Sequence, residues 1–132
     1  MNFSRKNKVY IIDDDKDVAQ STVILLQAQG LQTELFHSVE DFLTETDPTI
    51  SGCVVSDYAL EGNWNGIDLL RKIQDLGYRI PFILASGSLN HSSRLTAEKS
   101  GAFAIIEKPY PSENLCETIY AALKHNDRLF PN

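Results

Sequence analysis

Short apolar runs alternate along the chain with longer segments in which apolar residues recur every three or four positions. Three of the short runs are apolar almost throughout, which is typical of parallel strands that helices cover on both faces. Because each run precedes an amphipathic segment, the pattern predicts a βα-repeating α/β domain with a five-stranded parallel sheet. The five expected strands lie at 8–12, 31–36, 53–56, 82–85 and 104–106.

Capping residues support this division. Asp14 or Asp15 can accept hydrogen bonds from the first turn of the first helix, whose apolar positions include Val18 and Leu26. Gly30 suits the end of that helix, because glycine adopts the left-handed backbone conformation found there. The four later helices are expected to begin near Ser38, Gly66, Asn90 and Pro111.

Polar side chains follow the carboxyl ends of several expected strands. In an open parallel sheet, ligands bind beyond these ends, where the strand order reverses. If the strands concerned are neighbours, their terminal side chains share one pocket. These residues are Asp13, Asp14 and Asp15 after the first strand, Asp57 after the third, Ser86 after the fourth and Lys108 after the fifth.

Such a pocket suits a hard cation and a phosphate group. Two carboxylates 4 Å apart repel by about 4 kcal/mol at an effective dielectric constant of about 20, so a cluster of three requires a divalent cation or a lysine. Mg²⁺ takes a few carboxylate oxygens, keeps water molecules and completes its octahedron with phosphate oxygens. Lys108 and Ser86 can bind the same phosphate. One carboxylate then remains as a nucleophile toward phosphorus, which would give an acyl phosphate.

Five segments around these residues resemble the receiver domain of two-component response regulators. No single segment is specific, but the order and spacing of all five are, and they span about residues 7–126. The resemblance implies a flavodoxin-like (βα)5 three-layer sandwich with strand order 2-1-3-4-5, and one receiver domain over 1–132 with no output domain in this chain. The matching segments read VYIIDDD, CVVSDY, NGIDLL, PFILASG and GAFAIIEKP.

The resemblance also implies a phosphorelay function. Asp57 would accept a phosphoryl group from the phosphohistidine of a histidine kinase or of a histidine phosphotransfer protein. Ser86 would move onto the phosphoryl group, and Lys108 would pair with it. The peptide bond between Lys108 and Pro109 is expected to be cis. Such a protein is not an enzyme, apart from catalysing its own phosphorylation and dephosphorylation.

The metal ligands implied by the resemblance are carboxylates and one carbonyl. Asp14 and Asp57 would bind Mg²⁺ directly, and Asp13 would act largely through water. Ala59 would add its backbone carbonyl. Mn²⁺ is a suitable substitute for Mg²⁺ at such a site.

Three features depart from the common version of the family, and one of them is Ala59, two residues after Asp57, where many relatives carry a larger or polar side chain. The position three residues before Lys108 is usually aromatic but is Ile105 here, so an aromatic rotamer switch is not available at that position. The loop at 57–66 reads DYALEGNWNG, lacks the usual Met-Pro pair and is one residue longer than usual. Its Trp64 is either a partly exposed loop residue or a contact for a partner protein, since tryptophan is enriched at binding hot spots.

Composition limits the partners and the compartment. Twelve Lys and Arg residues against eighteen Asp and Glu residues give a net charge of −6, which disfavours direct binding of nucleic acid or of an anionic membrane. No apolar stretch approaches the roughly 18 residues of a membrane span. Cys53 and Cys116 lie in apolar stretches and are expected to be reduced, which favours the cytoplasm. The output would be a downstream protein target or a missing output domain, and phosphorylation-dependent homodimer formation stays open.

Three other functions fit parts of the sequence. A haloacid-dehalogenase-like phosphatase would use Asp13 as the nucleophile and Asp15 as the acid, but the threonine expected two residues later is Asp17. A flavodoxin-like mononucleotide binder would need a phosphate loop rich in Ser, Thr and Gly, whereas three aspartates repel phosphate. A receiver-like interaction module that is never phosphorylated has the same fold, although every residue needed for the chemistry is present.

Overall fold

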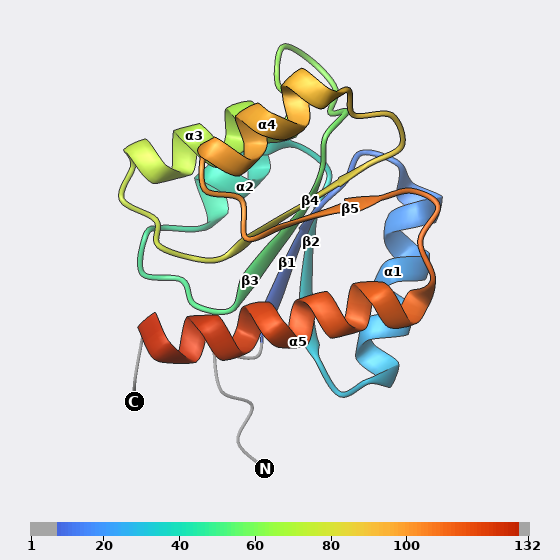
Figure 1. The fold of residues 1–132 in the computed structure, drawn as a ribbon. Helices are drawn as coiled ribbons and strands as arrows, with labels where there is room; N and C mark the ends of the chain where they lie inside the picture. The colour runs from blue at the N-terminus through green and yellow to red at the C-terminus, as the bar shows by residue number, and fades with distance from the viewer. Residues whose placement is uncertain (1–7, 130–132) are drawn as a thin grey trace.

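The five expected strands form one parallel sheet in the computed structural model, which describes residues 8–129 (Figure 1). The strand order β2-β1-β3-β4-β5 confirms the predicted topology. Each observed strand begins or ends within one residue of the expected position, and both Asp57 and Ser86 are included in their strands. The strands are β1 (Lys8–Ile12), β2 (Gln32–Phe36), β3 (Cys53–Asp57), β4 (Phe82–Ser86) and β5 (Ala104–Glu107).

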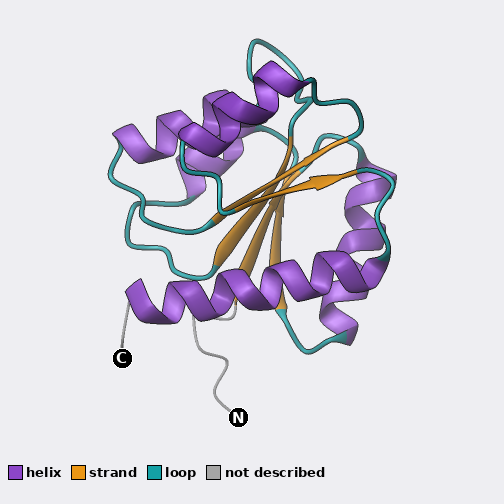
Figure 2. Ribbon diagram, viewed as in Figure 1, coloured by secondary structure: helices purple, strands orange, loops and turns teal. Residues whose placement is uncertain are grey.

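Helices cover both faces of the sheet and complete three layers (Figure 2). One face carries α1 and α5, and the opposite face carries α2, α3 and α4 (Figure 1). None of the described helices is long and apolar enough to cross a membrane. The helices are α1 (Lys16–Ala28), α2 (Val39–Glu45), α3 (Gly66–Asp75), α4 (His91–Lys99) and α5 (Ser112–Leu129).

The sheet is buried on both faces because its central strands are apolar at nearly every position. In β1, Tyr10 and Ile12 contact the core beneath α2, α3 and α4, whereas Val9 and Ile11 contact the core beneath α1 and α5. This alternation follows from the two-residue period of a strand. The free cysteines Cys53 and Cys116 lie in the second core, as expected for reduced thiols.

Asp15, rather than Asp14, caps the beginning of α1. The Asp15 side chain accepts hydrogen bonds from the backbone N–H groups of Asp17, at 3.1 Å, and Val18, at 3.2 Å. Asp14 is therefore not needed as the cap. The apolar face of α1 is narrower than its sequence indicates, because Leu26 is fully buried but Val18 is 40% exposed. Gly30 ends the helix with a φ of +81°, as predicted.

The loop that follows Asp57 is held at the beginning of α3. Asn65 caps the helix by accepting a hydrogen bond from Asp68 N–H at 2.9 Å, and the Asp68 carboxylate accepts one from Asn65 N–H at 3.1 Å. This reciprocal capping box stabilises the helix start. Gly66 N–H also donates to the Tyr58 carbonyl at 2.8 Å. These bonds keep α3 close to the carboxyl end of β3.

Gly66 is required by this close approach. A Cβ atom at position 66 would meet the Leu84 side chain and would lie 2.8 Å from the Asp57 carbonyl oxygen. We therefore expect Gly66→Ala to destabilise the fold by about 1–3 kcal/mol through overpacking, measured as a lower urea midpoint. Gly87→Ala is the control, because a Cβ there meets no atom within 4 Å. Equal midpoints for the two variants would contradict this explanation.

Candidate functional site

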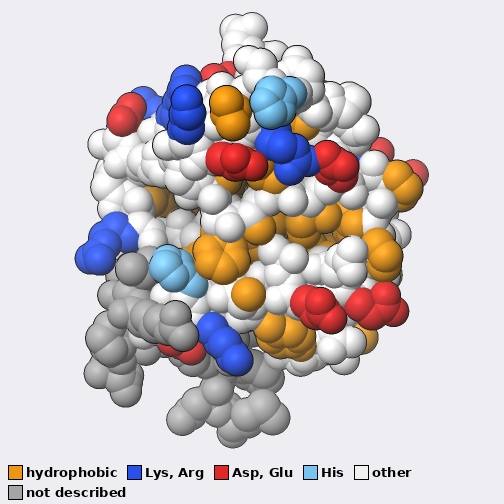
Figure 3. All heavy atoms as spheres, viewed as in Figure 1, with side chains coloured by type: hydrophobic (Ala, Val, Ile, Leu, Met, Phe, Trp, Pro, Cys, Tyr) orange, Lys and Arg blue, Asp and Glu red, His pale blue; other side chains and the backbone are white. Residues whose placement is uncertain are grey.

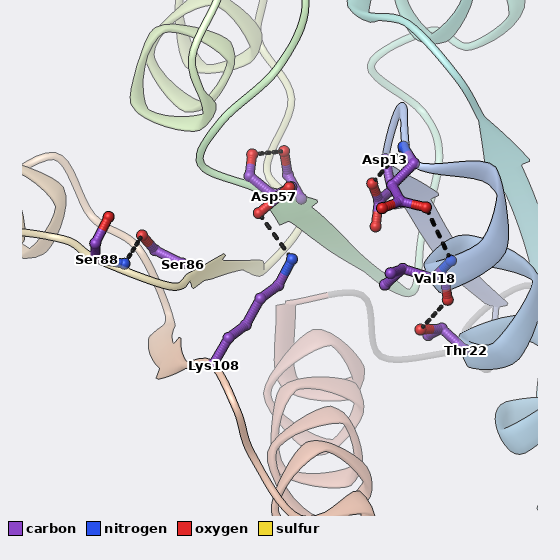
Figure 4. Close-up of polar contacts among 9 residues, drawn as sticks. Asp13, Val18, Thr22, Asp57, Ser86, Ser88 and Lys108 are labelled. Atoms are coloured by element: carbon purple, nitrogen blue, oxygen red, sulfur yellow. Dashed lines mark hydrogen bonds and ion pairs between the residues drawn. The ribbon is translucent and has the colours of Figure 1, made fainter.

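Three carboxylates converge at the carboxyl ends of β1 and β3. Asp13, Asp14 and Asp57 each offer one oxygen, and these oxygens lie within 4.8 Å of one another. Lys108, which follows β5, places its Nζ 3.1 Å from Asp57 Oδ1 (Figure 4). The structure therefore brings together the three predicted acids and the predicted lysine, although they are distant in the sequence.

Main-chain hydrogen bonds beyond the strand ends hold these residues in place. Asp13 N–H donates to the Phe36 carbonyl at 3.0 Å, which continues the pairing of β1 with β2. Lys108 N–H donates to the Ser86 carbonyl at 2.8 Å, which continues the pairing of β5 with β4. The peptide bond between Lys108 and Pro109 is cis, as expected. The backbone of the site is thus an extension of the sheet.

Two charged groups of the site, Asp13 and Lys108, have a shifted pKa. Asp13 is 6% exposed, and burial raises its pKa, against a hydrogen bond from Asp15 N–H at 2.9 Å that lowers it. The nearby charge of Asp57 raises the pKa of Asp13 further. Burial acts to lower the pKa of Lys108, but the hydrogen bond and charge of Asp57 outweigh it, so this pKa is raised. Lys108 is therefore held as a cation by the carboxylates it faces.

Ser86 lies at the end of β4 and is almost fully buried, at 4% exposed. Its hydroxyl oxygen accepts a hydrogen bond from Ser88 N–H at 3.2 Å (Figure 4). Among the described residues, no hydrogen bond joins the Ser86 hydroxyl group to the Asp57 carboxylate or to the Lys108 ammonium group. Ser86 is thus beside the Asp57–Lys108 pair but not part of it.

The loop after Asp57 turns back on itself. Ala59 is exposed and pairs with Asn65 in an isolated antiparallel bridge. Trp64 is half-buried against the core, and its Nε1 donates to the Glu40 carboxylate of α2 at 3.2 Å. The sequence did not predict this contact between the loop and α2.

Two further hydroxyl groups border the site without having been predicted. Thr22 on α1 and Tyr110 after β5 line a small cavity together with Asp13, Asp57 and Lys108. Tyr110 could have been predicted from the sequence, because it lies two residues after Lys108, which follows an expected strand. Thr22 could be found only once α1 was placed against the sheet.

This arrangement of carboxylates and a lysine at the end of a 2-1-3-4-5 sheet coincides with a known sequence family. The sequence model of the response regulator receiver domain matches residues 9–120. The chain belongs to this family. Receiver domains of two-component response regulators are signalling domains rather than classical enzymes, and they typically bind Mg²⁺ at an acidic pocket.

The curated relatives of this chain include response regulators. TodT of Pseudomonas putida strain F1 is 34% identical over 120 residues, which cover 91% of this receiver domain chain and 52% of TodT. FixJ of Rhizobium meliloti is 32% identical over 117 residues, which cover 89% of this chain and 57% of FixJ. The chain thus spans about half the length of these curated relatives.

Solved receiver domains share the fold over almost the whole chain. The crystal structure of FixJ-N superimposes with a TM-score of 0.82 and 31% identity, and covers 95% of this chain and 97% of that one. A receiver domain protein from Clostridium thermocellum gives a TM-score of 0.84 with 25% identity, over 93% and 98% of the two chains. The predicted flavodoxin-like receiver fold is confirmed.

The family match and the geometry both disfavour the other functions. A haloacid-dehalogenase-like phosphatase would direct its second acid at the substrate, but Asp15 uses its carboxylate to cap α1. A mononucleotide phosphate would face the acidic cluster of Asp13, Asp14 and Asp57. The receiver domain is the function that both observations favour.

Proposed function

We propose that this receiver domain accepts a phosphoryl group on Asp57 from the phosphohistidine of a histidine kinase or of a histidine phosphotransfer protein. The observation that carries the proposal is the convergence of Asp13, Asp14 and Asp57 within 4.8 Å, with Lys108 3.1 Å from Asp57. Asp57 is 16% exposed at its side chain, so it is reachable from solvent. A nucleophilic carboxylate, a cation and a metal-binding cluster thus meet at one point.

The cluster fits a divalent cation such as Mg²⁺, with Mn²⁺ as a substitute. Three carboxylates face a single described lysine, so one further double positive charge balances them. Carboxylate oxygens are the donors that hard cations prefer. Asp13, Asp14 and Asp57 would hold the ion, and Ala59 would add its backbone carbonyl. When bound, Mg²⁺ supplies positive charge to the oxygens of the incoming phosphoryl group.

The protein's own residues carry out the transfer. An oxygen of the Asp57 carboxylate attacks phosphorus, the bond between phosphorus and the imidazole nitrogen breaks, and its electron pair returns to the histidine. Lys108 moves its hydrogen bond from Asp57 to a phosphoryl oxygen, and the Ser86 hydroxyl donates another. Attack by water on the phosphorus later releases inorganic phosphate and regenerates Asp57. The domain therefore catalyses only its own phosphorylation and dephosphorylation.

The setting and partners follow from the same proposal. The receiver unit occupies about residues 7–126, of which 8–126 lie within the described residues, and it works in the cytoplasm with a protein target or an output domain. The net charge of −6 disfavours direct contact with nucleic acid. Apolar side chains gather on the face that carries α4, β5 and α5 (Figure 3). Leu95 of α4 is 39% exposed, which supports this face as the surface for a phosphorylation-dependent homodimer.

Trp64 provides the experiment that tests the site. Its loop begins directly after Asp57, and its indole is bonded to Glu40 at 3.2 Å, so a change in the loop changes its surroundings. We expect the fluorescence of Trp64 to change on addition of Mg²⁺ and again on addition of beryllofluoride, a mimic of the phosphoryl group.

Asp57→Ala is the matched control because it keeps Trp64 and removes the acceptor. The beryllofluoride step should disappear in this variant. An identical response in the variant and the wild type would contradict the proposed site, and would favour an interaction module that is not phosphorylated.

A further inference from the structure

A small cavity lies directly behind the Asp57–Lys108 pair, on the side of the sheet that carries α1. Its volume of about 10 Å³ is room for the centre of one water molecule. Its apolar walls come from β1, β3 and β4. Its polar lining consists of Asp13, Asp57, Lys108, Thr22 and Tyr110.

The two hydroxyl groups of this lining can both bind a ligand in the cavity. Thr22 donates its hydroxyl hydrogen to the Val18 carbonyl at 3.0 Å, so its oxygen remains an acceptor (Figure 4). Tyr110 is half-buried with its ring against the core beneath α1 and α5. None of the hydrogen bonds among residues 8–129 uses its hydroxyl group.

The Tyr110 hydroxyl is close to the charged groups of the site. Burial raises its pKa, and the charges of Lys108, Asp13 and Asp57 are all close enough to influence it. The hydroxyl therefore lies within the electrostatic field of the lysine and the carboxylates. Lys108 uses one of its three N–H groups on Asp57, which leaves donors for another partner.

We propose that one water molecule binds in this cavity, held by Tyr110 and Thr22, and that it links Lys108 to Asp13. Four polar groups of the lining are then available to the water, which is enough because buried waters typically make about three hydrogen bonds. Tyr110 is in this account a positioning residue, which acts through Lys108 and keeps its ammonium group aimed at Asp57. The inference rests on the proposed function, because Asp57 and Lys108 are the groups that take part in phosphoryl transfer.

Tyr110→Phe tests this role because it removes one oxygen and keeps the ring that contacts the core. We expect the rate at which acetyl phosphate phosphorylates Asp57 to fall by about two- to tenfold, the range set by one lost hydrogen bond. The urea midpoint should be unchanged, since the ring remains in place. Thr22→Val should lower the rate by a similar factor.

A double-mutant cycle separates a shared water from two independent effects. If both hydroxyl groups hold one water molecule, the double variant should be no slower than the slower single variant. In a Lys108→Met background, Tyr110→Phe should have no effect, because its action passes through the lysine. A purely structural role of Tyr110 predicts neither result.

Three outcomes would overturn the inference. They are a Tyr110→Phe rate equal to the wild-type rate, effects of Tyr110→Phe and Thr22→Val that multiply, and an effect of Tyr110→Phe that persists without Lys108. In each case labelling of the wild type leaves the proposed function intact. Absence of labelling in the wild type would overturn the proposed function and this inference with it.

Discussion

Replacing Lys108 by methionine should lower the rate at which acetyl phosphate phosphorylates Asp57 by a factor on the order of 10² to 10³. Enzymes usually lose this much rate when one donor that stabilises developing charge is removed. The ammonium group lies 3.1 Å from Asp57 Oδ1, and its pKa is raised by that carboxylate, so it is charged at neutral pH. Methionine keeps the apolar stem and removes only the cation. Intact-protein mass spectrometry during the first part of the reaction measures the rate.

The matched control is Lys124→Met, which removes an exposed lysine from α5. This variant should be phosphorylated at the wild-type rate, because Lys124 is not among the residues of the cluster. If Lys108→Met and Lys124→Met were phosphorylated equally fast, Lys108 would have no part in the transfer.

The second large effect, a loss of Mg²⁺ affinity, is expected on substitution of Asp14. This residue belongs to the acidic cluster and does not cap α1. Asp14→Asn keeps the size of the side chain but removes one negative charge. Loss of a group outside the ligand set already weakens metal sites by about 10- to 100-fold, so loss of a direct ligand should weaken Mg²⁺ binding by at least that factor. Titration of Trp64 fluorescence with Mg²⁺ gives the affinities.

Asp17→Asn is the control for this change of charge. Asp17 is exposed in the first turn of α1 and contributes no oxygen to the cluster. Its substitution should leave Mg²⁺ binding near the wild-type value. Equal losses of affinity at Asp14 and Asp17 would mean that general charge, rather than a metal site, attracts the ion.

The strands could be predicted from the sequence because buried strands are apolar at nearly every position. Residues 53–55 and 82–85 are apolar without interruption, as a strand covered on both faces requires. The side chains at the strand ends could be predicted for the same reason, since each follows a recognisable run. The order of the strands was not readable from these runs and came from the family resemblance.

Contacts between helices, strands and loops were harder to predict from the sequence. Val18 occupies an apolar position of α1 but is 40% exposed, because periodicity does not say how wide a face the sheet covers. The bond between Trp64 and Glu40 depends on how the loop after Asp57 docks onto α2. The capping box of Asn65 and Asp68 did have a readable signal, an Asn followed three residues later by Asp.

Phosphorylation of Asp57 is the central claim, and the most direct test is to locate the phosphoryl group. Incubation with acetyl phosphate and Mg²⁺, followed by peptide mapping, should find one phosphoryl group per chain on the peptide that contains Asp57. Asp57→Asn, or removal of Mg²⁺ by a chelator, should abolish it. Labelling of Asp57→Asn to the wild-type extent, or a phosphoryl group found on Asp13, would contradict the account.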